Sequence, residues 1–100
     1  MKYKKDKLRQ LEKNRYSLFC DGTCCYKCGT LYNLTWHEIF EGRNRQNSMR
    51  YGLCLKLCLD CHREITNDND FLDEWHKKGQ AKFEEVYPEL DFLSIFYKNY

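Results

Sequence analysis

The sequence has few residues that bend or break a chain: it contains one proline and five glycines in 100 residues, and it has no long apolar run. A membrane-crossing helix needs about 20 consecutive apolar residues, so we expect no membrane-spanning segment. No apolar stretch follows the basic N-terminus, so we expect no secretory signal and a cytoplasmic location. With 42% hydrophobic and 32% charged residues, the chain is too apolar for a disordered segment. Its length predicts a single domain, residues 1–100.

Cysteine is abundant by contrast, with seven residues. A disulfide framework and a metal site are the two alternatives. The odd count, the lack of an export signal and two C-x2-C pairs favour the metal, because thiols stay reduced in the cytosol. We predict a structural zinc ion that also supplies folding energy which a small core lacks. The predicted ligands are Cys25, Cys28, Cys58 and Cys61.

Three further cysteines lie near these pairs. Cys24 is an alternative ligand to Cys25, but only Cys25 has the two-residue spacing to Cys28. We expect Cys24, Cys20 and Cys54 to be structural, since free cysteine often packs as a small hydrophobic residue.

The net charge of +2 hides a gradient along the chain. Residues 1–15 carry seven basic and two acidic side chains, residues 16–63 carry six and four, and residues 64–100 carry four and nine. The basic part contains the cysteines, so the gradient favours an anionic partner on one side of the molecule. A basic helix that is simply solvated is the alternative.

The apolar pattern predicts an α+β fold. Residues 2–14 are expected to form a charged helix with a narrow apolar stripe. Alternating apolar residues predict strands over 33–40 and 53–59, with a polar loop over 42–48 between them. A short helix is expected over 61–66.

Two helices are predicted in the acidic C-terminal part. The first has Asp70 as its N-cap candidate and a buried face at spacings of three and four. A last short helix is expected to pack back on the domain. The buried residues would be Leu72, Trp75, Gly79, Phe83 and Val86 in the first helix, and Leu90, Leu93 and Phe96 in the second.

Two of the three histidines lie in the stretch that the cysteine pairs would close. His37 is on the first predicted strand and His62 follows Cys61, so a zinc ion would bring them near each other. Glu38 and three arginines would share their surface. This composition suits metal-assisted phosphodiester cleavage, in which imidazole or carboxylate binds an ion, a histidine activates water and arginines hold phosphate. The arginines are Arg43, Arg45 and Arg63.

Each of these residues also has a simpler interpretation. His37 could be a surface strand residue, His62 a helix-start residue and Glu38 a charge on an edge strand. His76 lies on the long predicted helix, where we expect it to be solvated.

The arrangement resembles the HNH, or ββα-metal, endonuclease family. The matching motifs are Cys25-x2-Cys28, His37-Glu38-Ile39-Phe40 and Leu57-Cys58-x2-Cys61-His62. The chain is more narrowly similar to small phage and prophage proteins related to the recombination-enhancing, RecA-dependent nucleases. That similarity rests on residues 11–17, 37–45, 51–53, 79–80 and 98–100.

The resemblance implies a zinc-stabilised β-hairpin followed by a helix, with a catalytic Mg2+ or Mn2+ between them. Residues 16–66 would form this core, flanked by the basic helix of residues 1–15 and the C-terminal helices of residues 67–100. His37 would be the base and His62 a metal ligand, and we expect Glu38 as a second ligand of the same ion. In the other register of the family motif, His37 is a ligand and Glu38 stands at the base position.

The function implied by the resemblance is a phage-derived DNA endonuclease that acts in recombination in the cytoplasm of a bacterial host. Its partners would be DNA and a RecA-type filament. DNA contacts are expected from Lys4, Lys5, Arg15, Arg43, Arg45 and Arg63, and their contribution to affinity would fall with salt. Two alternatives stay open: a DNA- or recombinase-binding module that has lost catalysis, and a structural zinc protein with a protein partner. Thr66, four residues after His62, is not the second histidine ligand often found there, which favours the binding module.

Overall fold

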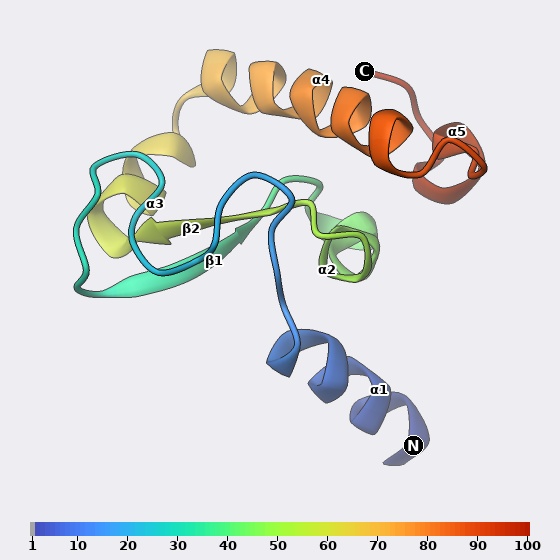
Figure 1. Cartoon of the computed structure of the whole chain (residues 1–100), viewed down its shortest axis with the longest axis horizontal. Helices are drawn as coiled ribbons and strands as arrows, with labels where there is room; N and C mark the ends of the chain where they lie inside the picture. The colour runs from blue at the N-terminus through green and yellow to red at the C-terminus, as the bar shows by residue number, and fades with distance from the viewer. Residues whose placement is uncertain (1) are drawn as a thin grey trace.

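The computed structural model describes residues 2–100, with side chains described from residue 7 onward. Two antiparallel strands and several helices form an α+β fold, as the sequence predicts (Figure 1). No helix within residues 2–100 is long and apolar enough to cross a membrane. The elements are α1 (Lys2–Lys13), β1 (Leu34–Glu38), the 3-10 turn η1 (Gly42–Asn44), α2 (Arg45–Arg50), β2 (Cys54–Cys58), α3 (Leu59–Ile65), α4 (Asn69–Val86) and α5 (Phe92–Phe96).

The pairing of β1 with β2 determines which side chains lie on each face of the hairpin. Leu34 pairs with Cys58 and Glu38 pairs with Cys54 at the two ends of the ladder. Because side chains alternate along a strand, His37 and Leu55 share one face while Glu38 points to the other. The face of Leu55 belongs to the hydrophobic core.

The core lies where the segment after β1 meets α4 and α5. Phe40 is fully buried and contacts the rings of Phe92 and Phe96, with centroids 5.3 and 4.9 Å away. Gly79 of α4 lies against this segment: a Cβ atom there would come within 2.9 Å of the Phe40 ring and 3.0 Å of Ile39. The buried position that the sequence predicts for Gly79 is therefore confirmed.

The prediction of a polar loop over 42–48 is wrong, because this segment forms η1 and the start of α2. Its polarity misleads, since Asn44 and Ser48 are buried and bind main-chain groups. The Asn44 amide donates to the Phe96 carbonyl at 2.9 Å, and the Ser48 hydroxyl donates to the Phe40 carbonyl at 2.7 Å. These polar residues therefore close the core rather than face solvent.

The helix limits also differ from the sequence prediction. Helix α3 starts at Leu59 instead of residue 61, with the Cys58 thiol accepting from the Cys61 N–H at its N-terminus. The N-cap of α4 is Asp68, not Asp70, because the Asp68 carboxylate accepts from the Phe71 N–H.

The residues that α5 buries also differ from the sequence prediction. Phe92 and Phe96 are buried, whereas Leu90 and Leu93 are 37% and 47% exposed. The four-residue spacing of the two phenylalanines matches one helix face, and Leu93 lies outside it. In α4, Trp75, Gly79 and Phe83 are buried as predicted, but Val86 is exposed.

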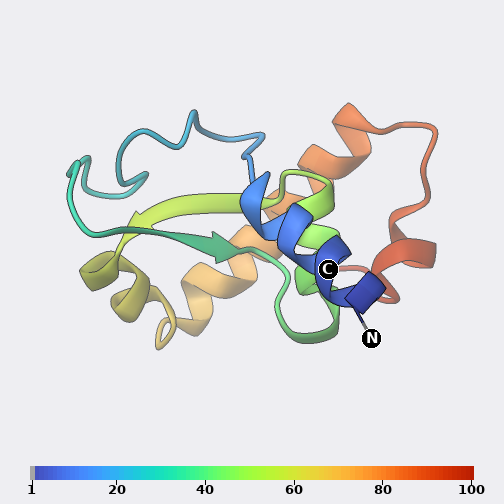
Figure 2. The same cartoon turned by 90° about the horizontal axis from the view of Figure 1, so that it is seen from below.

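In Figure 1, helix α1 lies apart from α4, on the side of the molecule where α2 lies; in Figure 2, seen from below, it lies in front of α2. The chain then passes along β2, where the Leu18 N–H donates to the Gly52 carbonyl and the Tyr26 N–H to the Lys56 carbonyl. The side chains of Lys4 and Lys5, expected to contact DNA, lie outside the described residues.

Candidate metal centre and histidine site

Four cysteine thiols converge at the end of the hairpin where α3 begins. The Sγ atoms of Cys25, Cys28, Cys58 and Cys61 all lie within 4.8 Å of one another. Tetrahedral zinc with Zn–S bonds of about 2.3 Å requires sulfur atoms about 3.8 Å apart, and the Cys28 and Cys58 sulfurs are 3.7 Å apart. The four cysteines could hold a metal ion such as zinc, as the sequence predicts.

Local backbone geometry aims these thiols at one point. The Cys25 thiol accepts from the Cys28 N–H at 3.4 Å, and the Cys58 thiol accepts from the Cys61 N–H at the same distance. Gly29 follows the first pair with φ +81°, a conformation that glycine adopts without strain. Both C-x2-C segments are therefore turns in which amide donors face the sulfur atoms.

The electrostatics of the four thiols also suit a cation. Burial alone would raise the pKa of the Cys25 thiol. Backbone N–H donors such as that of Cys28 have the larger opposite effect, so the pKa falls to about 6. Burial and the neighbouring thiols raise the pKa of Cys61 well above its usual range. One thiolate therefore forms easily and disfavours a second, unless a divalent cation compensates the charge.

The other three cysteines lie outside this cluster, which confirms Cys25 rather than Cys24 as its member. Cys54 is fully buried on β2, and burial raises the pKa of its thiol to about 12. Cys20 and Cys24 are half-buried. None of the seven thiols in the described residues forms a disulfide.

His37 and His62 face each other beside the cysteine cluster. Their ring centroids are 5.3 Å apart, with His37 on β1 and His62 on α3. His37 is 2% exposed, and its Nε2 atom is buried without a hydrogen-bond partner. Burial lowers the pKa of His37 to about 4, helped by the nearby imidazoles of His62 and His76. At neutral pH the His37 ring is therefore uncharged and keeps a lone pair.

The donors at this position fit some ions better than others. A buried imidazole nitrogen without a partner is costly, and a bound metal would satisfy it. The two histidines supply nitrogen ligands, which suit later transition metals such as iron or zinc, whereas Mg2+ and Mn2+ prefer oxygen ligands. Within the described residues, no cluster of three or more ligands other than the cysteines is present, so solvent or substrate would complete the coordination.

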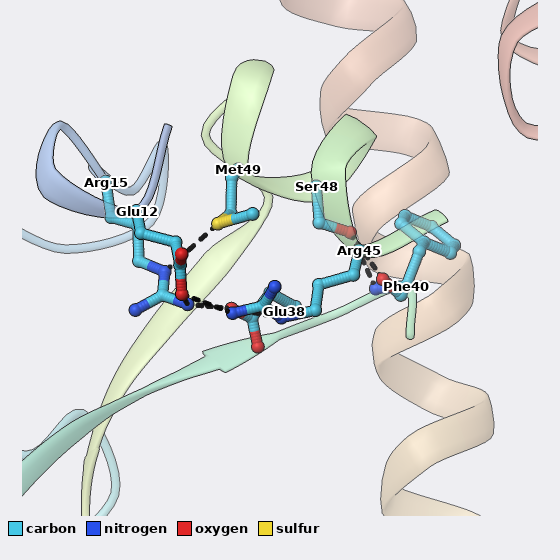
Figure 3. Close-up of polar contacts among 7 residues, drawn as sticks. All are labelled: Glu12, Arg15, Glu38, Phe40, Arg45, Ser48 and Met49. Carbon is cyan, nitrogen blue, oxygen red and sulfur yellow. Dashed lines mark hydrogen bonds and ion pairs between the residues drawn. The ribbon is translucent and has the colours of Figure 1, made fainter. Parts of the chain in front are cut away.

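Glu38 does not share the surface of the two histidines, which corrects the sequence expectation. Its Oε1 atom lies 2.7 Å from an Arg15 guanidinium nitrogen and 3.5 Å from Arg45 Nε (Figure 3). Glu12 of α1 joins the same cluster, with Oε2 at 3.0 Å from Arg45 and 3.7 Å from Arg15. The physical reason is strand alternation, which points neighbouring residues to opposite faces.

These ion pairs also change the expected roles of two arginines. Arg15 is only 17% exposed and donates to the Met49 sulfur as well as contacting two carboxylates. Arg45 is 37% exposed and contacts the same two carboxylates. Both guanidinium groups bind carboxylates in this structure instead of facing solvent ready for phosphate. The partner that the sequence prediction did not include is Glu12, three residues before Arg15. This short spacing is a local signal for the contact, although α1 ends at Lys13 and Arg15 lies just beyond it.

The other predicted residues take separate positions. Arg43 is exposed and lies over the Tyr97 ring, 4.6 Å from its centroid. Arg63 is exposed beside the cysteine cluster, where it lines a depression with Tyr32. His76 is not solvated as expected: it is half-buried, stacked on Phe40 at 5.4 Å and near another aromatic ring, that of Tyr100, at 4.7 Å.

The fold therefore brings the four thiols together and, at a separate position, the two imidazoles. The predicted carboxylate, Glu38, forms a third cluster with Arg15 and Arg45. Comparison with known proteins adds no assignment to this geometry: no protein-family model matches the chain, and no curated protein or solved structure is significantly similar to it.

Proposed function

We propose that this chain is a metal-dependent DNA endonuclease of the HNH type that hydrolyses phosphodiester bonds. The observation that carries the proposal is the buried, unpartnered Nε2 atom of His37 on β1, which lies beside His62 of α3. A hairpin followed by a helix, with an imidazole from each, is the arrangement that the family resemblance implies. The four cysteines would hold a structural zinc ion that fixes this junction.

In this proposal both histidines act as ligands of the catalytic ion. The lowered pKa of His37 favours a ligand over a base, because a ligand must be uncharged and a base works best near the ambient pH. An ion held there would polarise the phosphate and lower the pKa of its bound water. Arg63 follows His62 directly and is exposed, so it would contact a phosphate of the substrate. Glu38 has no role in catalysis in this scheme.

Of the two catalytic ions that the family resemblance implies, Mg2+ and Mn2+, the donor set is the better match for Mn2+. Two imidazoles without a carboxylate bind Mn2+ more readily than Mg2+, because Mg2+ prefers oxygen ligands and retains its water. Arg43 and the basic α1 would add affinity for DNA that depends on salt. A RecA-type partner stays a prediction of the family resemblance.

The test is nicking of a supercoiled plasmid by the full chain in Mn2+, in Mg2+ and in chelator. We expect His37→Ala and His62→Ala to lose at least about 100-fold of the Mn2+-dependent rate, as removal of metal ligands commonly does. His76→Phe is the matched control, since it removes the third imidazole but keeps an aromatic ring on Phe40. Equal rates in wild type and both alanine variants would overturn the proposal.

A binding module without catalysis is the second candidate function. It is favoured by the ion pairs of Glu38, which leave only two protein ligands at the histidine site. Salt-dependent DNA binding without cleavage in any divalent ion would support this candidate over the endonuclease.

A further inference from the structure

An apolar groove lies between α1 and α2. Leu11, Tyr16 and Met49 give it a largely apolar lining, and Lys7 and Arg50 add two cationic groups. Its volume is about 520 Å3. A helix of about 12 residues is marginal in water by itself, and α1 lies at the edge of the molecule, where its contacts are with α2 (Figure 1). A segment bound in the groove would therefore stabilise α1.

The charge of α1 restricts what this segment can be. Residues 1–15 carry seven basic and two acidic side chains. A second α1 helix packed into the groove would place like charges together and be repelled. The occupant should combine exposed apolar side chains with carboxylates and carry few cations.

The turn between α4 and α5 has this composition. We define the acidic turn as residues 84–93, which contain four acidic residues and no basic one. Among them Val86, Leu90 and Leu93 are 40%, 37% and 47% exposed. Large apolar side chains that are exposed together often mark an interaction surface, and here they alternate with carboxylates such as Glu89.

The groove and the acidic turn adjoin each other within one molecule. Tyr16 lines the groove, and its hydroxyl hydrogen-bonds to the Tyr87 hydroxyl at 3.1 Å and donates to the Arg50 carbonyl at 2.9 Å. Tyr87 lies inside the acidic turn. A two-fold axis passing near this contact would bring each groove against the turn of a second copy, and such an interface closes at two subunits.

We propose that the chain forms a two-fold dimer in which the groove of each copy binds the acidic turn of the other. Leu90 and Leu93 would enter the apolar groove, and Glu89 would approach Arg50. A specific dimer buries about 800 Å2 on each partner, about an eighth of the 6703 Å2 accessible surface of this chain. In a two-fold dimer this buried area is divided between two equal groove–turn contacts, because each subunit contributes one groove and one acidic turn.

Sedimentation equilibrium of the full chain over a range of concentrations tests the dimer. We expect the mass to rise from 12.3 kDa towards twice that value, and the association to weaken as salt screens the charges. Arg50→Glu and Glu89→Lys should each weaken the dimer at least about tenfold, and the double variant should recover most of the affinity, as for a direct charge pair. Leu90→Asp should also weaken it, at a side chain that is 37% exposed in the single chain.

Glu74→Lys is the matched control, because Glu74 is an exposed acidic residue at the other end of α4. It should leave the association unchanged, and circular dichroism should show that all variants fold. A monomer at every concentration would overturn the proposal, as would a dimer insensitive to Arg50→Glu and to Leu90→Asp. Loss of DNA binding in Arg50→Glu with unchanged association would also overturn it and assign the groove to nucleic acid.

Discussion

The variant Glu38→Gln can distinguish a catalytic role of Glu38 from a structural one, because it removes the negative charge and keeps the shape of the side chain. Glu38 and Arg15 are 14% and 17% exposed, and their ion pair is 2.7 Å long. Breaking a fully buried pair costs about 3–5 kcal/mol, whereas an exposed pair contributes about 0.2–1 kcal/mol. Since water still reaches both side chains, we expect Glu38→Gln to lower the free energy of unfolding by about 2 kcal/mol.

Glu12→Gln is the internal comparison, because Glu12 contacts the same two arginines but is 39% exposed. Its loss should cost less than about 1 kcal/mol. Urea denaturation of the full chain, with its metal bound, measures both values. For a chain of this size, a loss of about 2 kcal/mol corresponds to a fall in Tm of about 8–16 °C.

The reasoning is refuted if Glu38→Gln leaves the stability unchanged while it abolishes metal binding at the histidines. That result would make Glu38 a ligand, and the ion pairs with Arg15 and Arg45 would be incidental. If the structural account holds, Glu38→Gln keeps Mn2+ affinity and loses stability more than Glu12→Gln does.

Two further predictions concern the cysteine cluster and the contact between α4 and Phe40. The purified chain should contain one zinc ion per molecule, and a strong chelator should unfold it, because binding of structural zinc contributes about 10–16 kcal/mol in small domains. Circular dichroism and metal analysis should show that Cys28→Ser loses the ion and that Cys24→Ser retains it. Gly79→Ala should lower the free energy of unfolding by about 1 kcal/mol, because crowding against buried Phe40 costs about 1–3 kcal/mol and exceeds the gain of about 1 kcal/mol in helix propensity; a variant more stable than wild type in urea would contradict this.

The features that the sequence predicts correctly depend on short spacings. Two C-x2-C pairs are local turns, and their convergence follows once the alternating residues 34–38 and 54–58 form a hairpin. The helical fold of residues 42–50 escaped prediction because its polar residues bind distant main-chain groups. Asn44 contacts the Phe96 carbonyl, 52 positions away, and no local pattern indicates that contact.

Glu38 shows a different limit, since the information was present in the strand pattern itself. Alternation already separates Glu38 from His37, and the expectation that both face one ion disregarded it. What the sequence could not indicate is the pairing of Glu38 on the other face. Glu12 lies on α1 and Arg15 just after it, and about 20 residues of irregular chain separate α1 from the hairpin.

The separation of the two hairpin faces also limits how the sites can influence each other. Cys58 and Cys61 lie at the N-terminus of α3, the helix that carries His62, so a metal bound by these two cysteines and by Cys25 and Cys28 would fix that helix. Loss of that metal should therefore disorder the histidine site. Loss of the Glu38 ion pairs should instead act mainly on α1, because Glu12 lies on that helix and Arg15 follows it closely. The two histidines depend on the thiols, and the position of α1 depends on the carboxylates.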